Sequence, residues 1–207
     1  MDSTTNLIDR AYGYRPEINY LVAGASGCGK TTFLERITIG KIGGDDFRVP
    51  NKPFVLTNSA QENSPLLNFH ENECVDLEQK KVRPEVLVLC YDIGNPASLE
   101  ELDPIVSLPG LYIYKYFPMA RIYGADIAVV VIGLKRDLRH EKQEGEFIDP
   151  LIGYKTAQAL EGAMYLECSA TTEELIPAVV EDLVKKGLDV KTGKAYQASG
   201  MGNCIVC

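Results

Sequence analysis

One stretch of this sequence decides the fold, Gly24-Ala25-Ser26-Gly27-Cys28-Gly29-Lys30-Thr31. It follows the apolar run Ile18 to Ala23 and precedes a segment in which Phe33, Leu34 and Ile37 fall on one helical face. The order is therefore strand, glycine-rich loop and helix, which is the setting that a phosphate-binding loop requires. The alternative is a glycine-rich turn that fits the pattern by chance.

The chemistry of phosphate binding explains these residue types. Glycines let the backbone curl so that successive N–H groups point at phosphate oxygens, and the helix that begins at the end of the loop adds its positive dipole. Lys30 would reach the terminal phosphates of a nucleotide, and the Thr31 hydroxyl would hold Mg²⁺. The stretch thus predicts a nucleotide site.

Composition limits the classes of protein that remain. The chain has 207 residues, enough for one domain with a full core, and its 45% hydrophobic and 24% charged residues are ordinary for a soluble globular protein. The formal net charge of −8 argues against a nucleic-acid partner, because phosphate backbones attract basic surfaces. The six cysteines are not spaced like a disulfide framework, and we find neither a signal peptide nor a run of about 18 apolar residues. We therefore expect reduced thiols and an intracellular protein.

The chain divides into three parts. We expect a flexible lead-in over residues 1–16, one domain over residues 17–188 and a flexible tail over residues 189–207. Residues 47–84 contain prolines and only short apolar pieces, so we expect one or two short edge strands and much loop there.

Regular structure resumes after this stretch. Continuous apolar runs predict buried strands over 85–91 and 127–132, with a further strand over 164–166. Helices are predicted over residues 99–102, 114–123, 153–160 and 177–186. Strands that alternate with helices indicate an α/β fold with a mostly parallel central sheet and helices on both faces.

Two loops at predicted strand ends have the composition of base-recognition loops. One is Gly133-Leu134-Lys135-Arg136-Asp137, and the other is Glu167-Cys168-Ser169-Ala170. Ligands of open α/β sheets bind at the carboxyl ends of strands, where these loops and the phosphate loop converge. The Asp137 carboxylate could accept two hydrogen bonds from the N1–H and 2-amino groups of guanine, which adenine lacks. Alternatively, Asp137 is a helix N-cap or a solvated carboxylate, and Ser169 is an ordinary turn residue.

Several segments resemble the small GTPases of the Ras superfamily, and the Rho family most closely. They occur in the family's order and read Val88-Leu89-Cys90-Tyr91-Asp92-Ile93-Gly94-Asn95-Pro96-Ala97-Ser98-Leu99, Lys115-Tyr116-Phe117-Pro118, Gly133 to Arg139 and Tyr165-Leu166-Glu167-Cys168-Ser169-Ala170. The resemblance covers residues 17–188 and is thin between Phe47 and Pro84.

The resemblance implies a P-loop NTPase fold, the small G domain, that binds GTP or GDP with Mg²⁺. Lys30 would act catalytically on the terminal phosphates, Asp137 would bind the guanine edge, and the Lys135 stem would cover the base. The backbone of Ser169 and Ala170 would meet the guanine oxygen. The remaining nucleotide-binding residues would be Gly24, Ala25, Ser26, Gly27, Cys28, Gly29, Thr31 and Thr32.

Two departures from the family pattern lie in these loops. Leu134 stands where the family has Asn or Thr, which removes a polar tie between the base and phosphate loops; at about 1 kcal/mol per net hydrogen bond, affinity would fall several-fold. Ser26 stands where the family usually has glycine, in the space used by a catalytic glutamine and a partner's arginine finger. Slow hydrolysis is the expected consequence.

The switch segments depart further. Asn51 replaces the threonine that closes on Mg²⁺ and the γ-phosphate, and a second switch of the form Asp-Thr-Ala-Gly-Gln is not found. Asp76 with Gln79 and the segment 57–61 are candidates for it. Asp76 is either the metal-side carboxylate or a solvated loop acid. The helical insert that marks Rho proteins is reduced to residues 140–146.

The last four residues, Cys204-Ile205-Val206-Cys207, fit a prenylation box with Cys204 as the lipidated residue. A metal or redox C-x-x-C pair is the alternative. One prenyl chain attaches a protein to a membrane only reversibly. The expected location is therefore the cytoplasmic face of a membrane, the plasma membrane by analogy with Rho proteins, with a cytosolic pool.

The leading hypothesis is an atypical Rho-like GTPase with effectors, exchange factors and GTPase-activating proteins of the Rho type as partners. The alternatives are a pseudo-GTPase that serves as a scaffold, with nucleotide bound permanently or not at all, and a phosphate-loop kinase of small metabolites. The kinase would need an arginine-rich lid and would not use the two base loops.

Overall fold

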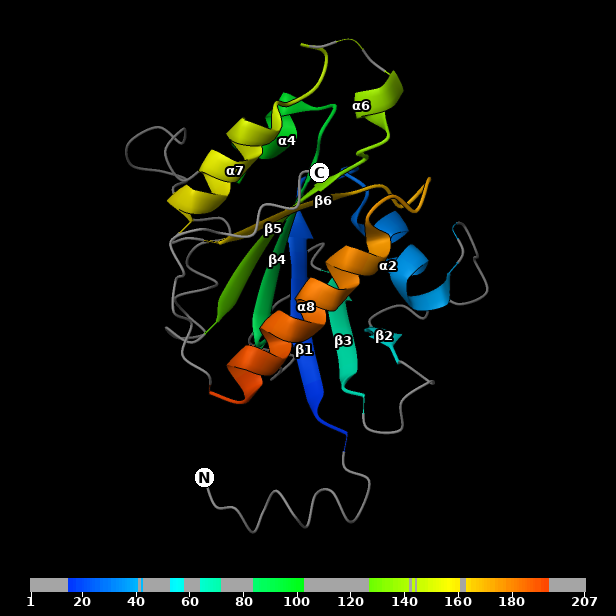
Figure 1. Ribbon diagram of the computed structural model, residues 1–207, viewed down its shortest axis with the longest axis vertical. Helices are drawn as coiled ribbons and strands as arrows, with labels where there is room; N and C mark the ends of the chain where they lie inside the picture. Colours follow the sequence, from blue (N-terminus) through cyan, green and yellow to red (C-terminus); the bar gives the residue numbers. More distant parts are fainter. Residues whose placement is uncertain are drawn as a thin grey trace.

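A central β-sheet organises the computed structural model, which describes residues 15–40, 42, 53–57, 64–71, 84–102, 127–141, 143, 145–160 and 163–193. Within these residues the sheet has six strands in the order β2-β3-β1-β4-β5-β6 (Figure 1). The strands are β1 (Glu17–Gly24), β2 (Phe54–Leu56), β3 (Leu66–Glu71), β4 (Val86–Asp92), β5 (Ala128–Leu134) and β6 (Met164–Cys168). All neighbours are parallel except the antiparallel pair β2 and β3. The predicted α/β fold with a mostly parallel sheet is confirmed.

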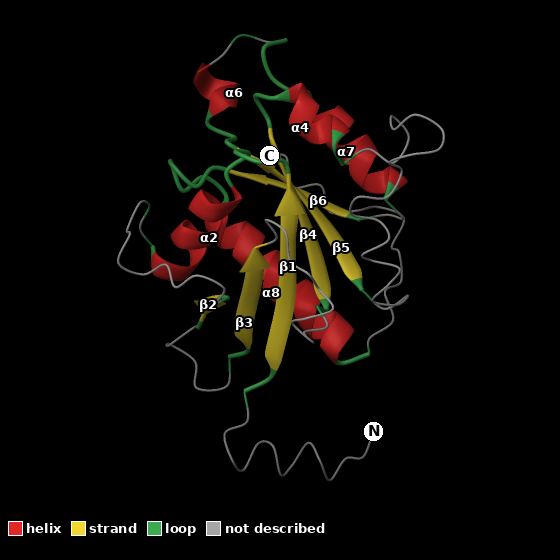
Figure 2. Ribbon diagram, turned by 180° about the vertical axis from the view of Figure 1, so that it is seen from behind, coloured by secondary structure: helices red, strands yellow, loops and turns green. Residues whose placement is uncertain are grey.

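Helices cover both faces of the sheet. Those described are α2 (Lys30–Ile39), α4 (Pro96–Glu100), α6 (Leu138–Glu141), α7 (Pro150–Ala159) and α8 (Ile176–Lys191). In Figure 1, α8 lies in front of the sheet, and in Figure 2, seen from behind, it lies behind the strands. The two faces therefore form separate cores, one under α2 and α8 and one under α4 and α7.

The middle strands are buried on both faces, as their continuous apolar runs predict. In β4, Val88 belongs to the core under α2 and α8, whereas its neighbour Leu89 belongs to the opposite core. Alternate residues of a strand point to opposite faces, so a strand covered on both sides must be apolar throughout.

Several element boundaries differ from those expected. Strand β5 continues to Leu134 because its last residues pair with β4 and β6. Strand β6 includes Glu167 and Cys168, for which the sequence predicts a loop. Helix α7 begins at Pro150 because Asp149 caps it, its Oδ1 accepting from the Leu151 N–H at 2.7 Å. Pairing with neighbours and capping by side chains thus extend elements beyond their apolar patterns.

Two helices near the predicted loop and tail segments, α8 and α6, also have bounds other than those predicted. Helix α8 ends at Lys191, past the expected end at Lys186 and past the expected start of the tail at Asp189. Its last turn is stabilised by Lys191, whose Nζ lies 2.6 Å from the Glu85 carboxylate, and by Val190, which packs against the core. A short helix, α6 (Leu138–Glu141), follows the base loop and overlaps the start of the expected insert, residues 140–146.

Strand β3 is not an edge strand. It lies between β2 and β1 and pairs in parallel with β1 from Leu66 to Glu71, so β2 rather than β3 is at this edge of the sheet. Its buried residues Leu67 and Phe69 alternate with less buried neighbours, the pattern of a strand covered mainly on one face. The predicted helix at 114–123 and residues 1–14 of the lead-in expected over residues 1–16 lie outside the described residues.

Candidate nucleotide site

The phosphate loop joins the end of β1 to the start of α2, as its sequence predicts. Gly24 has φ +146°, and a Cβ there would lie 2.0 Å from the Cys90 carbonyl oxygen of β4. Gly29 caps α2 in the left-handed region with φ +109°. Both positions therefore require glycine, one for close approach and one for backbone conformation. The resulting turn leads directly into the N-terminus of a ten-residue helix, where anions are favoured.

Lys30 lies inside the curve of this loop. Its side chain is only 4% exposed, and Nζ donates hydrogen bonds to the Ala25 carbonyl at 2.8 Å and to the Gly24 carbonyl at 3.2 Å. These bonds hold a positive charge against the loop backbone, beside the helix N-terminus. The loop can thus offer an anion an ammonium group together with backbone N–H groups.

Two side-chain oxygens of the kind that bind Mg²⁺ lie beside the loop. The Thr31 hydroxyl donates to Glu71 Oε1 at 2.6 Å, which brings the end of β3 against the first turn of α2. A hydroxyl and a carboxylate fit Mg²⁺, which is usually bound through one or two carboxylates together with substrate phosphates. Sequence reasoning missed Glu71, and the available signal was its place just after the short apolar piece 66–69. Asp76, the carboxylate expected for this role, lies outside the described residues.

The described cysteines are free, buried thiols beneath this loop and its neighbours. Burial raises the pKa of Cys28, although the nearby Lys30 ammonium partly offsets that shift. Burial also raises the pKa of Cys90 and of Cys168. These side chains therefore pack as small apolar groups rather than as reactive thiolates.

The first base loop follows β5. Lys135 adopts φ +64°, and its Nζ lies 2.7 Å from Asp92 Oδ2 and 3.5 Å from the Gly27 carbonyl oxygen. The lysine thus spans from the end of β4 to the phosphate loop. Leu134 is buried, and its side chain approaches Gly29, so an apolar contact occupies the place of the polar tie that the family pattern would provide.

Asp137 presents a buried oxygen. No hydrogen-bond partner within the described part of the chain reaches its Oδ1, although the atom is shielded from solvent. An unsatisfied buried carboxylate oxygen is costly, so a donor from a ligand would stabilise it. The residue precedes helix α6, but Oδ1 makes none of the hydrogen bonds that an N-cap would make there.

The second base loop is tied to the rest of the site. Ser169 is buried, its N–H donates to the Glu174 carbonyl at 3.0 Å, and its Oγ accepts from the Thr172 N–H at 3.1 Å. The Ala170 carbonyl accepts a 2.7 Å hydrogen bond from Nε of Arg36, a residue of α2. Helix α2, which follows the phosphate loop, therefore also anchors the loop that contains Ser169 and Ala170.

A backbone hydrogen bond joins the two base loops. The Arg136 N–H donates to the Cys168 carbonyl at 3.1 Å. The structure thus connects the phosphate loop, the Lys135 loop and the Ser169 loop at one end of the parallel sheet. Thr32 lies in the first turn of α2, and Ser26 is exposed on the phosphate loop. Asn51 and Cys204 lie outside the described residues.

Comparison with known proteins identifies the family. The family model described as the Ras family matches residues 77–189, which is more than half of the chain. The chain belongs to the Ras family of small GTPases. This membership agrees with the observed P-loop fold and sets aside the metabolite-kinase alternative.

The small GTPase is distantly related to Rho proteins. It is 25% identical over 190 residues to the Rho-related GTP-binding protein RhoF of Mus musculus, with 84% of each chain covered. It is 24% identical to RhoF of Homo sapiens over the same length and 23% identical over 208 residues to the Rho-related GTP-binding protein RhoD of Homo sapiens, with 91% of each chain covered. The predicted relationship to the Ras superfamily and to Rho proteins is confirmed.

The match to the family model begins after the phosphate loop, at residue 77. It contains both base loops, whereas most of the segment in which the resemblance is thin, residues 47–76 of 47–84, lies before it. None of the described helices is long and apolar enough to cross a membrane.

Proposed function

We propose that this small GTPase is a Rho-like guanine-nucleotide switch that binds GTP and GDP and hydrolyses GTP slowly. One observation carries the proposal, namely that two loops lie at the same end of the sheet, the phosphate loop with its buried Lys30 and the loop whose Asp137 Oδ1 has no partner among the described residues. Guanine offers two N–H donors to such a carboxylate, whereas adenine does not. The ligand is therefore a guanine nucleotide.

Each loop would hold one part of the nucleotide. The backbone of residues 24–31 and the Lys30 ammonium would bind the phosphates, the Lys135 stem would cover the base, and the backbone of Ser169 and Ala170 would meet the guanine oxygen. Thr31 and Glu71 would hold Mg²⁺, which neutralises charge on the terminal phosphates when bound.

Hydrolysis would proceed by in-line attack of water on the γ-phosphate, with Lys30 stabilising charge on the transferring group. Ser26 supports a slow rate because its side chain is exposed on the phosphate loop, in the space expected for the catalytic glutamine and an arginine finger. An arginine finger contributes about 10³–10⁵ in rate, so poor access to it would leave little stimulated hydrolysis.

The GTP-bound form would bind effectors, and exchange factors and GTPase-activating proteins of the Rho type would set the balance between GTP and GDP. A prenyl group on Cys204 would attach the protein reversibly to the cytoplasmic face of a membrane, the plasma membrane by analogy, with a cytosolic pool.

A pseudo-GTPase scaffold is the second candidate. Asn51 in place of the first-switch threonine and the lack of an identifiable second switch favour it, because both segments normally change with the state of the γ-phosphate. Such a protein would have the same fold but would not respond to the exchange of GDP for GTP.

The nucleotide that co-purifies with the full-length protein tests these candidates. The protein is denatured and the supernatant is separated by anion-exchange chromatography. Bound GDP is the expected result and means that the degenerate switches still hydrolyse GTP. Bound GTP would mean binding without effective turnover. A protein free of nucleotide, and unable to bind added GDP or GTP, would contradict the proposal and support the scaffold.

A further inference from the structure

We propose that Asp92 and Glu167 are positioning residues for base recognition, each holding one side of the loop formed by residues 135–137. The inference rests on the proposed guanine-nucleotide site. The two carboxylates act through the residues that they hold, and they lie on either side of the strand that leads into the loop.

The sheet register places the two acids on either side of the end of β5, opposite consecutive residues of that strand. Asp92 pairs with Leu134 between β4 and β5, and Glu167 pairs with Gly133 between β5 and β6. The loop begins directly after Leu134. Each flanking strand therefore supplies one carboxylate at the level where the middle strand ends.

Asp92 holds Lys135. Its Oδ2 lies 2.7 Å from Lys135 Nζ, while its Oδ1 accepts from the Gly94 N–H at 2.8 Å. The Ser98 hydroxyl accepts from the Asp92 N–H at 2.9 Å, so the acid is fixed by its own turn. Because Lys135 has φ +64° and its Nζ is anchored, both ends of its side chain are constrained. The stem that would cover the base is therefore kept in place.

The same lysine links the base loop to the phosphate loop. Its Nζ lies 3.5 Å from the Gly27 carbonyl oxygen, in addition to its contact with Asp92. The preceding Leu134 offers only an apolar contact to Gly29. The chain of contacts from Asp92 through Lys135 to Gly27 thus supplies a polar connection that Leu134 cannot make.

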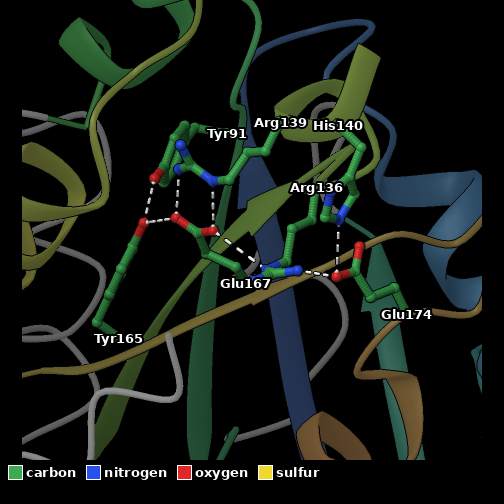
Figure 3. Close-up of polar contacts among 7 residues, drawn as sticks. All are labelled: Tyr91, Arg136, Arg139, His140, Tyr165, Glu167 and Glu174. Carbon is green, nitrogen blue, oxygen red and sulfur yellow. Dashed lines mark hydrogen bonds and ion pairs between the residues drawn. The ribbon is translucent and has the colours of Figure 1, made fainter. Parts of the chain in front are cut away.

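Glu167 holds the opposite side of the loop. Its side chain is fully buried, and Arg139 binds it in a bidentate manner, with Nε to Oε2 at 2.8 Å and Nη2 to Oε1 at 2.6 Å (Figure 3). The Tyr165 hydroxyl also donates to Oε1, and the Tyr91 hydroxyl lies 2.7 Å from that of Tyr165. A buried carboxylate is stable only when it is paired and hydrogen-bonded in this way.

Arg136 extends this cluster to the residue before Asp137. Its Nε lies 3.7 Å from Glu167 Oε2, and its Nη1 forms an ion pair with Glu174 (Figure 3). Its backbone N–H donates to the Cys168 carbonyl. Asp137 thus lies between two arginines, Arg136 and Arg139, that both pair with Glu167. The orientation of the base-reading carboxylate consequently depends on an acid in the neighbouring strand.

The test uses the full-length protein loaded with fluorescent N-methylanthraniloyl-GDP. The rate of dissociation of the fluorescent nucleotide is measured after addition of excess unlabelled GDP in a buffer that contains Mg²⁺. Base discrimination is measured as the ratio of the affinities for GDP and for inosine diphosphate, which lacks the 2-amino group. Melting temperature is recorded in parallel. A purely structural role would lower the melting temperature but leave the GDP-to-inosine-diphosphate ratio unchanged.

Asp92→Asn keeps the shape of the side chain but removes its charge, and we expect about three- to tenfold faster GDP dissociation, since the pair is partly exposed. Glu85→Gln is the matched control. Glu85 lies next to the opposite end of β4 and has a 2.6 Å ion pair with Lys191, and its side chain is 17% exposed against 13% for Asp92. The control should keep the wild-type dissociation rate.

Glu167→Gln should accelerate dissociation at least about tenfold and reduce the GDP-to-inosine-diphosphate ratio, because the largely buried Arg139 guanidinium loses its counter-charge and Arg136 keeps only its ion pair with Glu174. Arg139→Lys provides a second variant if that protein does not fold, since it keeps the positive charge and loses only the bidentate geometry. If the unmodified protein binds GDP selectively but both Asp92→Asn and Arg139→Lys keep its dissociation rate and its GDP-to-inosine-diphosphate ratio, this inference is overturned and the proposed function is not. Wild-type protein that does not bind the fluorescent GDP would overturn the proposed function and this inference with it.

Discussion

The Thr31 hydroxyl donates a 2.6 Å hydrogen bond to the carboxylate of Glu71, a residue 40 positions away in the sequence. This contact joins the phosphate-loop helix to the end of β3 and makes Glu71 the described acid best placed to share Mg²⁺ with Thr31. Glu71→Gln should therefore raise the Mg²⁺ concentration required for tight GDP binding by about tenfold or more, since a carboxylate ligand is replaced by an amide. The measurement is the GDP dissociation rate as a function of free Mg²⁺.

Asp76→Asn is the control for this prediction, because Asp76 was the acid selected from the sequence for the same role. A normal Mg²⁺ dependence in Glu71→Gln together with an altered one in Asp76→Asn would reverse the assignment.

Lys30→Ala should abolish nucleotide binding. The buried ammonium is the one positive side chain within the described phosphate loop, and its removal also frees the Gly24 and Ala25 carbonyls that it holds. Charge-assisted hydrogen bonds of this kind contribute about 1.5–3 kcal/mol each, so affinity should fall by at least about a hundredfold. Isothermal titration calorimetry with GDP measures the loss, and circular dichroism establishes that the variant is folded. Retention of wild-type affinity would refute the phosphate-loop assignment.

Asp137→Asn should shift base preference from guanine toward xanthine. The substitution replaces one acceptor oxygen of the carboxylate with an N–H₂ donor, which repels the 2-amino group of guanine and matches the 2-oxo group of xanthine. A good bidentate base contact discriminates by about 1–3 kcal/mol, so the ratio of affinities for GDP and xanthosine diphosphate should change by about ten- to a hundredfold. Competition against fluorescent GDP gives this ratio. A protein indifferent to the change would not use this loop to read the base.

Tyr20 should make the stability of the protein decline at alkaline pH. Burial, with a smaller contribution from Glu85, raises the pKa of its hydroxyl, which donates to the Leu183 carbonyl at 2.8 Å. The folded protein therefore keeps a proton that the unfolded chain releases above about pH 10. The stabilisation is complete below that pH and is lost as the pH rises above it.

Tyr20→Phe tests this pH dependence. At pH 7 the variant should lose about 1 kcal/mol of unfolding free energy with the hydrogen bond. Above pH 10 the gap between wild type and variant should narrow, by up to about 1.4 kcal/mol per pH unit. Urea unfolding at pH 7, 9 and 10.5 in the presence of a reductant measures the gap. Parallel pH profiles for the two proteins would show that Tyr20 does not ionise on unfolding in this range.

The order of strand, glycine loop and helix around residues 24–31 could be predicted because each part has a local signature. Glycine at positions 24 and 29 meets conformational requirements of the loop, and the apolar periods on either side define a strand and a helix. The buried strands β4 and β5 were equally predictable, since a strand covered on both faces must be apolar along its whole length. Lys135 and Asp137 could be proposed as base-loop residues because they follow such a strand directly.

The sequence by itself determined the fold class and the order of the loops, because short-range patterns carry that information. Only the tertiary structure decided that β3 lies inside the sheet, that Glu71 meets Thr31, and that Asp92 and Glu167 flank the base loop. These pairs join residues 28 to 43 positions apart. Their meeting depends on which strands become neighbours and in what register, and no local periodicity encodes that choice.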